Sequence, residues 1–93
     1  MSEKVVQTSV KRLLDLFNVA VYDTSQPFRA KITPGVPDLI CFCEKRGLFF
    51  VEVKDEKGKQ TPAQSAFECL ANKAGIPYIL GGVDEVKSFL SQR

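Results

Sequence analysis

The chain has 93 residues, of which 44% are hydrophobic and 26% charged, and its formal net charge is +2. This length supports one domain with one compact core, and the composition excludes disordered and collagen-like proteins. No apolar run reaches the roughly 18–20 residues of a membrane helix, and the N-terminus lacks the pattern of a signal peptide. We therefore expect a single domain, residues 1–93, in a soluble intracellular protein that has no membrane partner.

The N-terminal part of the chain predicts a helix and then a strand. Apolar side chains recur over residues 3–17 at the spacing of one helical face, with Ser2 as the expected cap and Asn18 as the expected end. The segment 19–22 is typical of a short strand. Residues 23–37 contain three prolines and a glycine, which indicates an irregular segment.

Two apolar runs in the middle of the chain predict a β-hairpin. The runs cover residues 39–43 and 48–53, and the polar segment 44–47 between them is the expected turn. Both runs are almost continuously apolar, which indicates strands covered on both faces of the sheet. A lysine-rich loop, residues 55–60, follows the second run.

The C-terminal part predicts a helix, a short strand and a last helix. Thr61 is the expected cap of the helix and Pro62 its first residue, and the strand 78–80 and the helix 84–91 follow. A strand, a helix and a further strand in succession form a βαβ unit with parallel strands. The fold class is therefore α/β, a single-domain αβββαβα arrangement with a mixed four-stranded sheet flanked by helices.

The absence of histidine excludes several kinds of active site. The chain has no histidine and three cysteines, Cys41, Cys43 and Cys69, in hydrophobic stretches. Catalysis by Ser-His-Asp or Cys-His systems is therefore ruled out. An odd number of cysteines is not a disulfide framework, and we expect buried free thiols rather than a zinc site.

Three charged residues interrupt the expected core. Asp38 precedes the first strand of the hairpin, and Glu52 and Lys54 lie on one face of the second strand because side chains alternate with a period of two. The hairpin brings both carboxylates and the ammonium group to one place. Charges in such an apolar run are costly to bury unless they are paired or bind a metal. A simple Glu52–Lys54 ion pair is the alternative to a functional site.

This set of residues suits the hydrolysis of phosphodiester bonds. Asp38 and Glu52 are expected to hold Mg²⁺ or Mn²⁺, with the backbone carbonyl of Val53 as a further ligand. A divalent ion polarises the phosphate and lowers the pKa of a bound water. Lys54 is expected to orient that water or to stabilise charge that develops on the phosphate. No small-molecule cofactor is expected.

Three motifs in the sequence resemble those of the VRR-NUC group in the PD-(D/E)xK nuclease superfamily. They are Gly-Val-Pro-Asp-Leu-Ile at 35–40, Phe-Val-Glu-Val-Lys at 50–54 and Thr-Pro-Ala-Gln at 61–64. The resemblance implies a restriction-endonuclease-like fold, metal binding by Asp38 and Glu52, and water activation by Lys54.

The resemblance also implies two accessory residues. Gln64 would contact the site from its helix, although Thr61 and Gln64 also match a capping box, and the two roles are compatible. The segment Glu3-Lys4-Val5-Val6-Gln7 matches the family's first-helix motif and makes Glu3 a further candidate metal ligand. A helix N-terminus favours an acidic residue in any case.

Basic residues beside the motifs are candidate contacts for nucleic acid. They are Arg29, Lys31, Lys57 and Lys59. Solvated loop surface is the alternative interpretation of this clustering. A domain this small has little room for a separate recognition module, so selectivity is expected from the shape of the DNA backbone.

The expected function is that of a Mg²⁺- or Mn²⁺-dependent endonuclease acting on branched or duplex DNA. Small family members resemble Holliday-junction resolvases, and a homodimer would match the symmetry of a four-way junction. The family name also suggests DNA repair or replication in a phage genome, and hence the cytoplasm of a bacterial or phage-infected cell. The alternatives are an inactive nucleic-acid-binding module and a domain that docks a replication protein.

Overall fold

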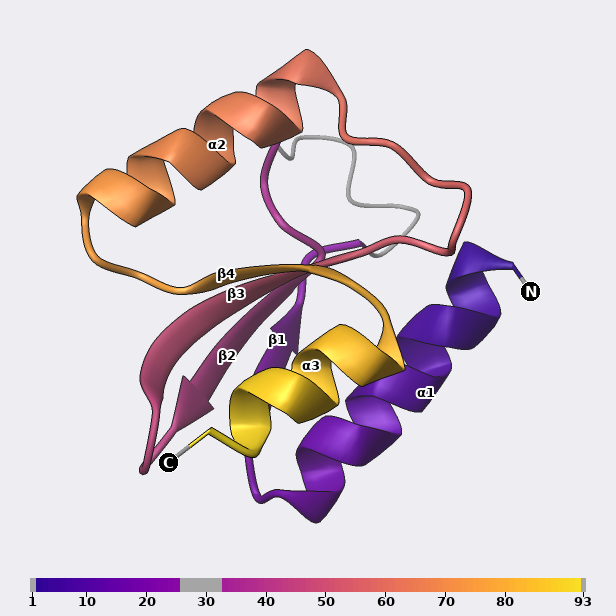
Figure 1. Ribbon diagram of the computed structural model, residues 1–93, viewed down its shortest axis with the longest axis vertical. Helices are drawn as coiled ribbons and strands as arrows, with labels where there is room; N and C mark the ends of the chain where they lie inside the picture. The colour runs from indigo at the N-terminus through magenta and orange to yellow at the C-terminus, as the bar shows by residue number, and fades with distance from the viewer. Residues whose placement is uncertain (1, 26–32, 93) are drawn as a thin grey trace.

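A computed structural model of the chain describes residues 2–25 and 33–92. Its sheet has four strands in the order β1-β2-β3-β4, with helices on both faces (Figure 1). The elements, in chain order, are α1 (Glu3–Leu16), β1 (Ala20–Asp23), β2 (Leu39–Cys43), β3 (Gly47–Val53), α2 (Pro62–Lys73), β4 (Tyr78–Gly81) and α3 (Val83–Leu90). This arrangement confirms the predicted α/β fold and the order of its elements.

The strand pairing also agrees with the prediction. β2 pairs antiparallel with β1 and with β3, and β3 pairs parallel with β4 across the α2 crossover. The tight turn between β2 and β3 forms the predicted hairpin. The sheet is therefore mixed, and the C-terminal end of β3 lies beside the N-terminal end of β2.

The core lies between the sheet and the pair of helices α1 and α3. Val10 and Leu14 of α1, Val86 of α3, and Phe49 and Val51 of β3 are fully buried there. Figure 1 shows the two helices side by side on this face. The predicted apolar face of α1 is confirmed except at its end, where Phe17 is the cap residue and is 43% exposed.

The opposite face of the sheet is only partly covered, so the prediction that both hairpin strands are covered on both faces is wrong for β2. Phe67 of α2 packs against Phe50 and Tyr78, so α2 covers the half of the sheet near β4. Tyr22 of β1 and Phe42 of β2 remain 64% and 49% exposed. One helix is too narrow to cover four strands, so β2 is not buried on both faces.

The ends of the helices follow the chemistry of their capping residues. The Ser2 hydroxyl accepts a hydrogen bond from the Val5 N–H at the start of α1. Asn18, two residues beyond α1, has a φ of 58°, the left-handed conformation that often follows a helix. Thr61 and Gln64 form the predicted capping box at the start of α2. Leu70 follows Phe67 at the spacing of one helical face, but it is 64% exposed.

The three cysteines are free thiols, as predicted, but they are not all buried. Cys41 is buried, Cys43 is half-buried and Cys69 is exposed on α2. Burial raises the pKa of the Cys41 thiol to about 12, and the nearby Cys43 adds to the effect. Within residues 2–25 and 33–92, no helix is long and apolar enough to cross a membrane.

Candidate metal-binding site at the end of the hairpin

Asp38 and Glu52 meet at the end of the β2–β3 hairpin. Leu39 pairs with Val51 in the last described step of the ladder, so Asp38 and Glu52 occupy the next opposed positions. The Asp38 carboxylate turns toward β3, where its Oδ2 accepts a hydrogen bond of 2.9 Å from the Val53 N–H. The predicted convergence of the two carboxyl groups is therefore present.

Glu52 is the one buried charged residue in the described part of the chain, with 2% of its surface exposed. Its Oε2 accepts a hydrogen bond from Gln64, whereas its Oε1 is buried without a hydrogen-bond partner among the described residues. Burial and, next, the charge of the adjacent Asp38 carboxyl raise the pKa of Glu52 from 4.5 to about 8. The charge of the Lys54 ammonium lowers the pKa of Glu52, but by less than burial and Asp38 raise it.

Lys54 completes the cluster on the same face of β3. Its Nζ lies 3.8 Å from Glu52 Oε2, and its side chain is 13% exposed. The ion pair considered as an alternative from the sequence is therefore present, but it is long and, in the described part of the chain, leaves Glu52 Oε1 without a partner. The hydrogen bond from Gln64 and the ion pair with Lys54 reach the same oxygen of Glu52.

Gln64 performs both roles that the sequence allowed. Its side-chain Oε1 accepts a hydrogen bond of 2.8 Å from the Thr61 N–H, which closes the capping box. Its Nε2 donates a hydrogen bond of 2.9 Å to Glu52 Oε2. An amide has an acceptor and a donor on one group, so a single side chain links the start of α2 to the buried carboxyl.

The close packing of the loop before Asp38 keeps α2 next to the site. Gly35 has a φ of 94°, and a Cβ at this position would lie 2.4 Å from the carbonyl oxygen of Ala63 in the first turn of α2. A side chain here would push the loop and the helix apart. Glycine therefore lets the segment that carries Asp38 approach the helix that carries Gln64.

The donor set fits a hard divalent cation. Two adjacent carboxyl groups provide oxygen ligands of the kind that Mg²⁺ binds while it keeps several waters, and one buried oxygen of Glu52 has no hydrogen-bond partner among the residues that the structure describes. No group of three or more His, Cys, Asp or Glu side chains close enough to hold a metal occurs among the described residues. Two protein carboxylates are nevertheless a normal complement for Mg²⁺ at a phosphate site.

Glu3 lies near this site but not within the carboxylate cluster. It is exposed at the start of α1 and lines, together with Asp38, a groove of about 590 Å³ between α1 and the strand ends. The rest of the groove lining comes from Lys4, Gln7, Thr8, Lys11, Asp23 and Ser25. Glu3 as a metal ligand stays a prediction, as does the carbonyl of Val53.

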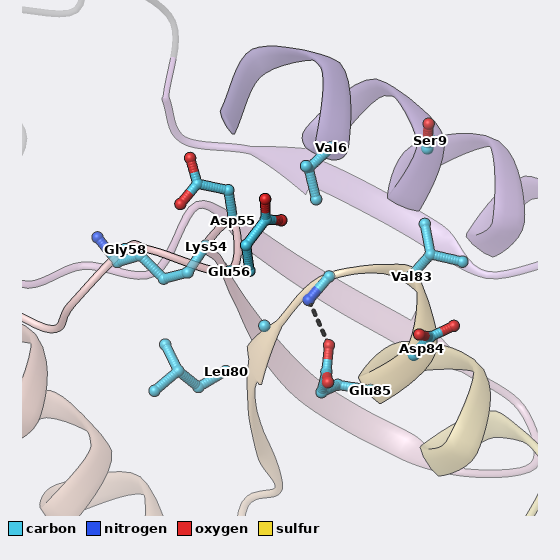
Figure 2. Close-up of a pocket in the computed structure, with 12 residues that line it drawn as sticks. Val6, Ser9, Lys54, Asp55, Glu56, Gly58, Leu80, Val83, Asp84 and Glu85 are labelled. Carbon is cyan, nitrogen blue, oxygen red and sulfur yellow. Dashed lines mark hydrogen bonds between the residues drawn. The ribbon is translucent and has the colours of Figure 1, made fainter. Parts of the chain in front are cut away.

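A second hollow, of about 550 Å³, lies on the other side of Lys54 and reaches the start of α3 (Figure 2). It contains the acidic residues Asp55, Glu56, Asp84 and Glu85. Glu85 Oε1 accepts a hydrogen bond of 2.7 Å from the Gly82 N–H and so caps α3. Four acidic side chains and one basic side chain, Lys54, line this hollow, so its charge disfavours the binding of phosphate there.

The basic residues predicted to contact nucleic acid are only partly described. Lys57 and Lys59 are exposed in the loop between β3 and α2, close along the chain to Lys54. Arg29 and Lys31 lie outside the described residues. The role of these four residues in binding stays a prediction.

The structure also reveals a polar network that the sequence motifs did not indicate. Asp23, at the end of β1, accepts hydrogen bonds from Lys11 and Gln7 of α1 and from Ser25. Partial burial raises the pKa of the Asp23 carboxyl, but the hydrogen bonds from Lys11 and Ser25 and the charge of Lys11 outweigh it, so the pKa is lowered. The run of polar residues that begins at Asp23 was the only signal in the sequence.

Comparison with known proteins gives one informative match. No protein-family model matches the sequence, and no curated protein matches it. A solved structure described as a VRR_NUC domain superposes with a TM-score of 0.75 and 29% sequence identity. The match covers 97% of this chain and 95% of the other, so it includes every element that carries the candidate site. It confirms the resemblance that the three motifs indicated.

Proposed function

We propose, on the premise that this chain belongs to the VRR-NUC family and has its nuclease fold, that it cleaves DNA with Mg²⁺ or Mn²⁺ held by Asp38 and Glu52. One observation carries the proposal. A fully buried glutamate has a second carboxyl group beside it and one oxygen that finds no hydrogen-bond partner within residues 2–25 and 33–92. Such an arrangement is unfavourable for a structural role and is relieved when a cation binds between the two groups.

The residues around the ion would have separate tasks. A bound Mg²⁺ or Mn²⁺ would polarise the scissile phosphate and lower the pKa of a bound water. Gln64 holds Glu52 Oε2 in place, which leaves Oε1 free to face a ligand. Lys54, whose ammonium lies at the same carboxylate, would donate a hydrogen bond to the water or to the developing negative charge.

We further propose that the protein is a structure-specific endonuclease that acts as a homodimer. Ala20, Tyr22, Ile40 and Phe42 form an apolar patch on the sheet face that α2 leaves uncovered. Contiguous exposed apolar residues of this kind are typical of contact surfaces. Light scattering of the purified protein would measure the mass in solution, and a monomer at every concentration would exclude a stable dimer.

A cleavage panel tests the activity. Single-stranded, duplex, flap and four-way DNA are incubated with the protein in Mg²⁺, in Mn²⁺ and in chelator. We expect cleavage with either ion, none with chelator, and the highest rate on branched DNA. Cleavage that persists in chelator would contradict the proposed chemistry.

A pair of lysine variants tests the mechanism. Lys54→Ala should lower kcat by about 10²-fold or more, the size of effect found when one group that stabilises transition-state charge is removed. Lys45→Ala, in the exposed turn of the hairpin, is the matched control and should cleave like the wild type. If Lys54→Ala kept its activity, Lys54 would have no role in the chemical step.

A further inference from the structure

The segment at the end of β1 connects the candidate site to α1. The Thr24 N–H donates a hydrogen bond of 2.8 Å to the Asp38 carbonyl, which extends the β1–β2 ladder by one step. The Thr24 hydroxyl lies within hydrogen-bond distance of the same carbonyl, at 3.1 Å, and of the Pro37 carbonyl. Thr24 therefore contacts the carbonyls of the two peptide groups that flank the Cα of Asp38.

These contacts bear on the direction of the Asp38 side chain. The two carbonyl groups flank the rotatable backbone bonds of Asp38, so fixing both carbonyls limits the orientation of its Cα–Cβ bond. Pro37 is fully buried, which holds the other end of the peptide. The Asp38 carboxylate then reaches the Val53 N–H and lies beside Glu52.

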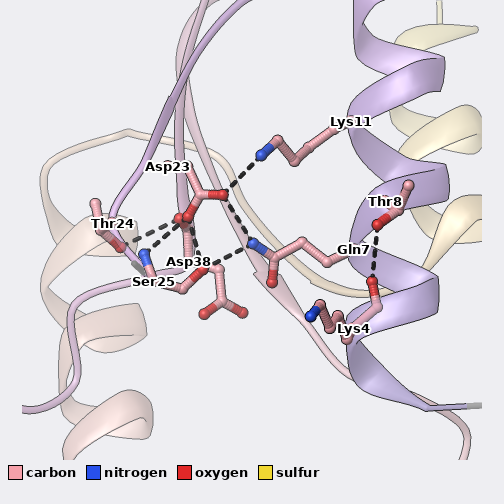
Figure 3. Close-up of polar contacts among 8 residues, drawn as sticks. All are labelled: Lys4, Gln7, Thr8, Lys11, Asp23, Thr24, Ser25 and Asp38. Carbon is pink, nitrogen blue, oxygen red and sulfur yellow. Dashed lines mark hydrogen bonds and ion pairs between the residues drawn. The ribbon is translucent and has the colours of Figure 1, made fainter. Parts of the chain in front are cut away.

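The residues on either side of Thr24 anchor it to α1. Asp23 Oδ2 lies 2.8 Å from Lys11 Nζ and 3.1 Å from Gln7 Nε2, and its Oδ1 accepts two hydrogen bonds from Ser25 (Figure 3). Gln7 also donates a hydrogen bond of 2.8 Å to Ser25 Oγ. Both oxygens of Asp23 are thus occupied by protein donors. Asp23 serves as an anchor for this segment, and Thr24 is held between it and Asp38.

We propose that Thr24 is a positioning residue, whose hydroxyl sets the orientation of Asp38 for metal binding. The inference rests on the proposed function, because Asp38 is a ligand only if the protein binds a divalent ion. Groups that orient metal ligands typically contribute 10–100-fold to metal affinity. The Thr24 hydroxyl acts through the backbone of Asp38, so we expect an effect near the lower end of this range.

Metal titration of the whole chain tests this role. Mn²⁺ affinity is measured by calorimetry for the wild type, Thr24→Val and Thr24→Ser. Valine keeps the shape and the backbone N–H but lacks the hydroxyl, whereas serine keeps the hydroxyl. We expect Mn²⁺ binding to weaken about 10-fold in Thr24→Val and to stay within about 2-fold of the wild type in Thr24→Ser.

A control separates positioning from stability. Val19 is buried just before the first residue of β1, and Val19→Ala should lower the Tm without changing Mn²⁺ affinity. Valine suits a strand as well as threonine does, so Thr24→Val should fold, and Thr24→Ala provides a second variant without the hydroxyl. Unchanged Mn²⁺ affinity in both hydroxyl-free variants, or an equal loss in Val19→Ala, would overturn the inference.

The same titration distinguishes this inference from the proposed function. If the wild type binds Mn²⁺ but cuts none of the DNA substrates, the nuclease proposal fails, and the Thr24 variants still decide the role of the hydroxyl. If the wild type cuts DNA and Thr24→Val binds Mn²⁺ normally, only the Thr24 inference fails. A wild type that binds no Mn²⁺ at all overturns both.

Discussion

Replacing Glu52 with glutamine should stabilise the metal-free protein at alkaline pH. In the wild type, an ionised Glu52 would be buried beside the Asp38 carboxyl, with only a long ion pair to Lys54. The amide introduced by Glu52→Gln would carry no charge, and its carbonyl oxygen would still accept the hydrogen bond from Gln64. The substitution therefore removes the repulsion and keeps the shape of the site.

The size and the sign of the effect follow from the pKa of Glu52. In the folded protein this pKa is raised from 4.5 to about 8 by burial and by Asp38. At about 1.4 kcal/mol per pH unit, this difference corresponds to roughly 4–5 kcal/mol. Between pH 4.5 and about 8 the folded state binds more protons than the unfolded state, so the free energy of unfolding falls as the pH rises. The loss is complete above about pH 8.

Thermal unfolding in chelator at pH 5 and pH 9 measures the effect. For a domain of this size 1 kcal/mol shifts the Tm by about 4–8 °C, so at pH 9 we expect the Tm of Glu52→Gln to exceed that of the wild type by more than about 10 °C. At pH 5 the two proteins should differ little. Glu44→Gln, at an exposed position in the hairpin turn, should follow the wild type at both pH values.

The addition of Mg²⁺ at pH 9 provides a second comparison. A cation that binds only the folded state raises its stability, so Mg²⁺ should restore the Tm of the wild type and leave Glu52→Gln nearly unchanged. If wild type and Glu52→Gln lost stability in parallel from pH 5 to pH 9, the ionisation of Glu52 would not cause the loss. A wild type more stable than Glu52→Gln at pH 9 in chelator would exclude a destabilising charge at this position.

Two further predictions concern the helix that supports the site. Gln64→Glu keeps an acceptor for the Thr61 N–H but places a second carboxylate against Glu52. Calorimetry or cleavage kinetics should therefore show a change of at least 10-fold in Mn²⁺ affinity or kcat/KM, while circular dichroism shows that α2 keeps its cap. Wild-type values would show that the amide does not support Glu52. Gly35→Ala should destabilise the protein by about 2–4 kcal/mol, through backbone strain and contact with Ala63, in urea unfolding. Gly75 also has a positive φ but open space around its Cβ position, so Gly75→Ala should cost less, and equal losses would exclude an effect of the contact with α2.

The sequence by itself determined the elements of the fold and the residues that form the cluster. Helix periodicity, the Thr61 cap and the apolar runs of the hairpin are local signals, and each element formed where these signals placed it. The proximity of the motif residues Asp38, Glu52 and Lys54 could be predicted because a hairpin has a defined register. For Gln64, local sequence predicted the capping box, and the family resemblance implied the contact with the site.

Only the tertiary structure decided which surfaces are covered and how the site is held. Tyr22, Phe42 and Leu70 are as apolar as core residues, and their exposure depends on the width of α2 relative to the sheet. The contacts of Asp23 and Thr24 join segments that are far apart in the chain through individual side-chain hydrogen bonds. Such bonds form only when the donor and acceptor atoms are placed to within about an ångström. Periodicity and composition carry no information about atomic positions at that scale, because these positions are set only when helix and sheet pack together.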